Sequence, residues 1–99
     1  MKIEAGKVYT MRMSYGEEIV GKIIAIDADT YTMSKPLSVI PGREGIQLMN
    51  SLFTADIEKE ITVNKTSVIM IATIRDDVLD SYTEATTGIK PIRSSILMG

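Results

Sequence analysis

Two glycines five residues apart, Gly16 and Gly21, constrain the fold of this chain more than any other feature. The second lies within the segment G-E-E-I-V-G-K-I-I-A-I-D, where isoleucine and valine favour an extended strand. Because a glycine weakens a strand interior, it usually marks a sharp bend or a close approach of another backbone. A strand that bends at Gly21 allows a small sheet to curl over itself. The segment therefore predicts a strongly bent sheet.

The same segment also comes close to the motif of a phosphate-binding loop. Residues 16–22 fit G-x-x-x-x-G-K, but the next position holds Ile23, which has no hydroxyl to bind Mg²⁺. Such a loop must also open a helix, whereas residues 19–26 are rich in β-branched side chains that favour a strand. We therefore exclude a nucleotide site and predict no cofactor.

The absence of two residue types excludes several kinds of chemistry. Among 99 residues there is no cysteine for a disulfide or a thiolate metal site, and no histidine to serve as a general base or metal ligand. The sequence offers no set of nucleophile, base and orienting group, so we predict that the protein is not an enzyme and holds no metal. A net charge of −2, from 11 basic and 13 acidic residues, argues against bulk electrostatic capture of nucleic acid.

Length and hydropathy predict one domain over residues 1–99. The longest apolar run, residues 68–72, is far too short to span a membrane. No basic and apolar secretion segment opens the sequence. We therefore expect a cytoplasmic protein without a membrane partner.

Alternating and β-branched segments predict five to six strands. In the first of them, Tyr9, Met11 and Met13 share one face, as in a half-buried strand. The last segment, S-V-I-M-I-A-T-I, is apolar almost throughout, which predicts cover on both of its faces. The expected strands are residues 7–13, 18–26, 30–40, 46–53, 60–63 and 67–74.

Prolines and small polar residues predict where the sheet is interrupted. Pro36 should produce a bulge or an edge in the third strand. Pro41 and Gly42 fit the central positions of a type II turn, so residues 41–45 are expected to form a hairpin tip. Residues 27–29 and 64–66 are expected to be tight turns.

After residue 74 the hydrophobic period becomes helical and predicts a helix at about residues 76–87. The apolar side chains at this spacing are Val78, Leu79, Tyr82 and Ala85. Asp76 is the expected N-cap and Gly88 the expected C-terminal stop. The tail, residues 88–99, either stays loose or docks on a neighbour. The strands at about residues 7–74, this helix and this tail make up the predicted domain.

The order of strands and turns resembles the Sm-like barrel, an SH3-like fold shared by Sm, LSm and bacterial Hfq proteins. The first Sm motif, apolar-x-x-G-x-x-x-x-G-x-apolar-x-x-x-D, is matched by Met13, Gly16, Gly21, Ile23 and Asp27. The second motif, a short apolar strand, a polar turn and a longer apolar strand, is matched by Ile61 and Val63, residues 64–66 and residues 68–71. The long middle hairpin and the trailing helix resemble Sm-like proteins of cyanophage-type viruses more closely still.

The resemblance, which spans residues 8–74, implies a fold and an assembly. The expected fold is mainly β: a small, strongly bent antiparallel barrel of five to six strands with a C-terminal helix. The expected partner is a second copy of the chain, in a cyclic homo-oligomer joined through edge strands at about residues 60–63 and 67–74. An independent reason for assembly is that residues 67–74 would form an uncharged edge, and such edges associate unless they are covered. For a viral protein, the location implied is the host cytoplasm.

The resemblance also implies a site for single-stranded RNA at one mouth of the pore. Tyr31 would stack on a base, Lys65 would meet a phosphate or stack, and Asn64 and Thr66 would bind base edges or the 2′-hydroxyl. The six expected RNA-binding residues are Asp27, Asp29, Tyr31, Asn64, Lys65 and Thr66. The chain has Asp29-Thr30-Tyr31 where the family has an aromatic residue or histidine and then Met-Asn. It has Asn64-Lys65 where the family has Arg-Gly or Lys-His.

A second function class remains open on the sequence alone. The same ring could be a structural or interaction scaffold that binds no nucleic acid, in which case the expected site residues have ordinary roles. Asp27 and Asp29 would then close a turn, Tyr31 would be a half-buried strand residue and Lys65 a solvated cation.

Overall fold

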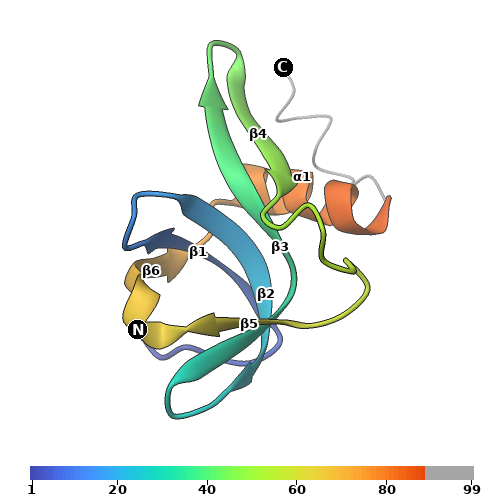
Figure 1. Ribbon diagram of the computed structural model, residues 1–99. Helices are drawn as coiled ribbons and strands as arrows, with labels where there is room; N and C mark the ends of the chain where they lie inside the picture. Colours follow the sequence, from blue (N-terminus) through green and yellow to red (C-terminus); the bar gives the residue numbers. More distant parts are fainter. Residues whose placement is uncertain (89–99) are drawn as a thin grey trace.

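The computed structural model describes residues 1–88 as a six-stranded antiparallel sheet followed by one helix (Figure 1). The predicted mainly β architecture with a C-terminal helix is therefore confirmed. The elements are β1 (Lys7–Met13), β2 (Glu18–Ile26), β3 (Thr30–Gly42), β4 (Gly45–Asn50), β5 (Ile61–Asn64), a 3₁₀ turn (Lys65–Ser67), β6 (Val68–Thr73) and α1 (Asp76–Thr87). Residues 89–99, most of the predicted tail, lie outside the described residues.

The strands follow the order β4-β3-β2-β1-β6, and β5 pairs with β3 beside this path. The long strand β3 serves two partners: its first part, Thr30–Met33, pairs with β5, and its last part, Leu37–Gly42, pairs with β4. Figure 1 shows β3 running from the lower turn to the tip of a projecting hairpin. Among residues 1–88 no strand pairing joins β6 to β4 or β5, so the sheet is not closed and the barrel stays a prediction.

The bend predicted at Gly21 coincides with a β-bulge. Gly21 in β2 faces two residues of β3, Lys35 and Pro36, because the pairing shifts by one residue there. Lys35 takes a positive φ of 48°. A Cβ atom on Gly21 would lie 2.5 Å from Cε of Met33 and 3.2 Å from Cα of Pro36. Both the bulge predicted at Pro36 and the close backbone approach predicted at Gly21 are therefore confirmed.

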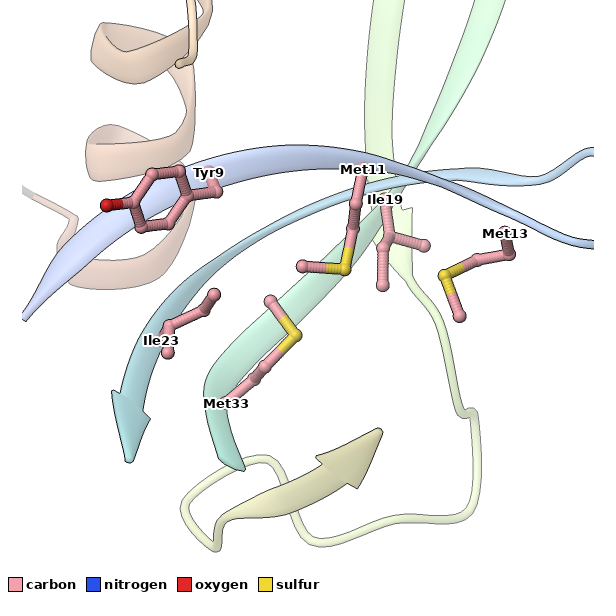
Figure 2. Close-up of a cluster of buried hydrophobic side chains, with 6 residues drawn as sticks. All are labelled: Tyr9, Met11, Met13, Ile19, Ile23 and Met33. Atoms are coloured by element: carbon pink, nitrogen blue, oxygen red, sulfur yellow. The ribbon is translucent and has the colours of Figure 1, made fainter. Parts of the chain in front are cut away.

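The first core cluster lies between β1, β2 and β3 (Figure 2). Its buried side chains are Tyr9, Met11, Met13, Ile19, Ile23 and Met33. The alternation predicted for β1 is confirmed, since Tyr9, Met11 and Met13 all point into this cluster. Half the cluster is methionine, whose unbranched and polarizable side chain fills irregular space beneath a strongly bent sheet.

The second core cluster joins the helix to the opposite face of the sheet. Its buried residues are Val20, Leu37, Ile74 and Tyr82, with Val39, Leu48, Val78 and Leu79 packed around them. The hydroxyl of Tyr82 accepts a hydrogen bond from the backbone N–H of Lys22 at 3.3 Å. It lies 2.9 Å and 3.0 Å from the carbonyl oxygens of Ser34 and Lys35, to which it donates. The helix therefore satisfies backbone groups beside the bulge.

One helix end matches the prediction and the other corrects it. Gly88 takes a left-handed φ of 75° and donates its N–H to the carbonyl of Glu84, as expected of a C-terminal stop. Asp76, however, is not the N-cap: that position is Arg75, which is extended, and Asp76 is the first helical residue. The Arg75 guanidinium binds the Asp77 carboxylate and holds the pKa of that carboxyl below its usual value.

Among residues 1–88 no helix has both the length and the apolar character needed to cross a bilayer.

The middle hairpin differs from its prediction. β3 continues through Pro41 to Gly42, which pairs with Gly45, so the connecting loop is only Arg43-Glu44. The prediction of a type II turn at Pro41-Gly42 is therefore wrong, because Pro41 is a strand residue opposite Ile46. A proline fits there because the other side of β3 has no ladder at this point. The expected strand at residues 46–53 is also shorter and ends at Asn50.

Within residues 1–88, the cover predicted for both faces of the last strand is absent. β6 is an edge strand paired only with β1 among the described residues. Ile69 and Met70 are 58% and 65% exposed. Of the residues of β6, only Val68 and Ile71 pack against the first core cluster, where they are partly buried. An uninterrupted apolar run thus gives an unprotected edge rather than a buried strand.

Candidate nucleic-acid interface

Two turns that are far apart in the sequence lie together at one edge of the sheet. β5 pairs with the start of β3, which places Asn64 opposite Thr30 and Val63 opposite Tyr31. The backbone N–H of Lys65 then donates to the carbonyl of Asp29 at 2.9 Å. The structure therefore brings together all the residues predicted to bind RNA. We call them the two-turn site: Asp27, Asp29, Tyr31, Asn64, Lys65 and Thr66.

The first turn is closed by hydrogen bonds around Asp27. Its N–H donates to the carbonyl of Thr30 at 2.9 Å, and the Thr30 hydroxyl donates to the Asp27 carboxylate at 3.4 Å. This arrangement is the turn chemistry expected of an aspartate that begins a tight connection. The carboxylates of Asp27 and Asp29 belong to exposed residues, so both remain accessible to solvent and ligands.

Tyr31 and Lys65 contact each other across the two turns. The Lys65 ammonium lies 5.1 Å from the centroid of the Tyr31 ring, which is the geometry of a cation–π interaction. Tyr31 is half-buried and packs against the first core cluster. The cation occupies a ring face that could otherwise stack on a base. A base that stacks on this face has to displace the lysine side chain.

The charges of the two-turn site are mixed. Two carboxylates, Asp27 and Asp29, stand beside one ammonium group, Lys65, and the exposed Asn64 and Thr66 add neutral donors and acceptors. The carboxylates repel phosphate while the ammonium attracts it. A ligand that fits the site must therefore reach Lys65 and the polar turn without placing phosphates against the carboxylates.

A cleft of about 360 Å³ lies elsewhere, between the β3–β4 hairpin and the start of α1. Its lining includes Arg12, Glu18, Ile46 and Arg75, and none of the six residues of the two-turn site. The sequence alone does not predict this cleft, because its walls come from elements that only the folded chain brings together. Within residues 1–88, no three or more acidic residues are placed to hold a metal ion.

Comparison of the sequence with models of known protein families gave no match, and neither did comparison with curated proteins. The class of protein therefore has to be inferred from the fold and the two-turn site.

Proposed function

We propose that this chain is a ring-forming protein with an Sm-like fold that binds single-stranded RNA at the two-turn site. The fold class is supported by the long bent strands β2 and β3 and by the 3₁₀ turn between the short β5 and β6. The motif glycines support it as well. Gly16 takes a positive φ of 98° in the β1–β2 turn, and Gly21 lies against the bulge.

The observation that carries the RNA proposal is that the Lys65 ammonium lies over the Tyr31 ring. The Lys65–Asp29 backbone hydrogen bond holds together the two turns to which these residues belong. An aromatic ring beside a cation, at an accessible turn, offers the two contacts that single-stranded nucleic acids use most. The ring stacks on a base once the lysine moves, and the freed ammonium meets a phosphate. Asn64 and Thr66 are exposed next to them and can bind base edges or the 2′-hydroxyl.

The assembly proposal is supported by the open edge of β6. Its six residues carry no charged side chain, and Ile69 and Met70 are more than half exposed. Natural edge strands of monomers are usually protected by charge, proline or a covering segment. A head-to-tail ring covers such an edge in every subunit.

A scaffold without nucleic acid is the second candidate, and one observation favours it. The Lys65 ammonium already has a partner in the Tyr31 ring, and the carboxylates of Asp27 and Asp29 flank the same turns. If these contacts are permanent, the two-turn site is a structural lock between β3 and β5. The ring would then act through its surfaces alone.

Binding of fluorescent oligo-U and oligo-A, titrated at several salt concentrations, separates the two candidates. We expect binding at low salt that weakens as salt rises, because phosphate contacts release counterions. Tyr31→Ala and Lys65→Ala should each abolish most of this binding. The matched controls, Tyr15→Ala and Lys59→Ala, change exposed residues outside the site and should leave it intact. Dissociation constants weaker than about 10 μM at low salt would favour the scaffold.

A further inference from the structure

In the part of the chain that the structure describes, β4 and β6 are unpaired on their outer sides and are matched in length and character. β4 (Gly45–Asn50) and β6 (Val68–Thr73) end the five-strand order on opposite sides, and each has six residues. Their sequences, G-I-Q-L-M-N and V-I-M-I-A-T, contain no charged residue and no proline. Neither strand thus carries the features by which proteins keep edges from pairing.

The two strands also present their side chains to defined faces. In β4, Leu48 packs on the second core cluster, so Ile46 and Leu48 point to the helix side of the sheet. In β6, Met70 and Ala72 lie opposite Arg12 and Thr10 of β1, which point away from the first core cluster. Met70 and Ala72 therefore belong to the helix side as well.

We propose that β4 of one copy pairs antiparallel with β6 of a second copy, with Ile46 opposite Ala72 and Leu48 opposite Met70. This inference rests on the proposed assembly through strand edges. The register continues each face of the sheet across the boundary over Met70–Thr73, whereas the β-bulge at Ile69 reverses the face of Val68. A slip of one residue would place the helix-side residues of one copy beside the opposite face of the other.

The register brings together side chains that one chain leaves exposed. Ile46 of β4, which is 44% exposed, lies opposite Ala72 in this register, and Leu48 lies opposite Met70, which is 65% exposed. The alternative edge, β5, offers only four residues and leads through the 3₁₀ turn directly into its own β6. The apolar residues of β5, Ile61 and Val63, are already partly buried within one chain, so β4 has more exposed apolar surface to contribute, and pairing there leaves the two-turn site open.

The pairing also completes a hollow that one chain forms only in part. A shallow depression of about 170 Å³ beside β6 is lined on one copy by Thr10, Arg12, Glu18, Met70 and Ala72, among others. In the proposed register, Ile46 and Leu48 of the second copy stand next to Met70 and Ala72 and add an apolar wall.

Engineered cysteines test the register directly, because the chain has none of its own. The double variant Ile46→Cys/Ala72→Cys places cysteines opposite each other on one face, within reach of a disulfide. After oxidation we expect loss of the single-chain band and a ladder of linked chains on a non-reducing gel. The matched control, Ile46→Cys/Thr73→Cys, directs the cysteines to opposite faces and should stay unlinked.

A third variant, Thr62→Cys/Ala72→Cys, reports on the β5 edge. If wild-type protein assembles and this variant gives the ladder in place of Ile46→Cys/Ala72→Cys, the inference is overturned while the assembly proposal stands. The inference is likewise overturned if the control links as well as the test pair, or if no pair links in an assembled protein. A wild-type particle with the mass of one chain would overturn both proposals. All three variants change exposed side chains, and circular dichroism checks that each remains folded.

Discussion

At the scale of single residues, Gly21 and Tyr82 hold the most bent part of the sheet. The bulge brings Pro36 and Met33 against Gly21, where a Cβ atom would crowd both residues. The hydroxyl of Tyr82 satisfies the neighbouring backbone groups of Lys22, Ser34 and Lys35 from the helix side. The glycine was foreseeable from its place in a β-branched run. The tyrosine was foreseeable only as a core residue of the helix, because its hydrogen bonds reach residues 47 to 60 positions away in the sequence.

Replacing Gly21 with alanine should destabilise the protein by about 1–3 kcal/mol, the usual cost of overpacking. The new Cβ would press on the backbone of Pro36, which cannot move away as the Met33 side chain can. Gly42→Ala is the control: its Cβ would meet one atom, the Gly45 carbonyl oxygen at 3.2 Å, at an exposed hairpin rather than in the core, so it should cost less. Urea unfolding monitored by circular dichroism measures both variants, and a Gly21→Ala midpoint equal to that of wild type would contradict the role given to this glycine.

Replacing Tyr82 with phenylalanine should lower the free energy of unfolding by about 1–3 kcal/mol, because partly buried backbone groups lose their partner. Tyr15→Phe provides the control, since that hydroxyl is exposed and bonds only to Glu17. The two variants are compared in urea at neutral pH. Equal losses for both would show that the Tyr82 hydroxyl does not support the bulge.

Tyr82 should also make the free energy of unfolding depend on pH in the alkaline range. Burial raises the pKa of Tyr82 above its ordinary value of 10.0. The unfolded chain therefore loses this proton first, and the contribution of Tyr82 falls as the pH rises through about 10 towards the folded pKa. The difference in unfolding free energy between wild type and Tyr82→Phe should shrink above pH 10. A difference that stays constant from pH 8 to 11 would refute this linkage.

At the scale of elements, hydrophobic periodicity predicted the six strands and the following helix in their order, while several boundaries were set by pairing. Pro41 fits a turn by local preference, yet the ladder with Ile46 carries it into β3. Asp76 fits an N-cap by its residue type, but it is already the first residue of the helix, and Arg75 before it occupies the N-cap position. The apolar composition of β6 suggested burial, but composition does not reveal whether the cover comes from the same chain.

An Ile69→Lys variant tests whether that cover comes from a second copy. The change places a charge on the exposed edge of β6, which blocks strand pairing between chains without disturbing the core. We expect a fold like that of wild type and weakened association. The matched control, Ile57→Lys, changes a comparably exposed isoleucine away from both free edges. Sedimentation equilibrium measures the association, and an unchanged mass for Ile69→Lys would argue against an interface at β6.

At the scale of the whole molecule, the proposed site was predictable as a set of residues but not as an arrangement. The two turns were expected to meet, and the Lys65–Asp29 hydrogen bond joins them. The position of the Lys65 ammonium over Tyr31 was not predictable, because a long flexible side chain can adopt many rotamers. That contact decides between an RNA site that opens and a lock that stays closed. The cleft beside α1 likewise depends on packing alone.

The mass of the particle in solution tests the central claim of edge-to-edge assembly most directly. Each chain contributes 10.9 kDa, and sedimentation equilibrium or native mass spectrometry resolves multiples of that value. We predict one defined multiple, larger than a dimer, that persists on dilution well below the concentration at which the protein is prepared. A particle of 10.9 kDa at high concentration would contradict the ring.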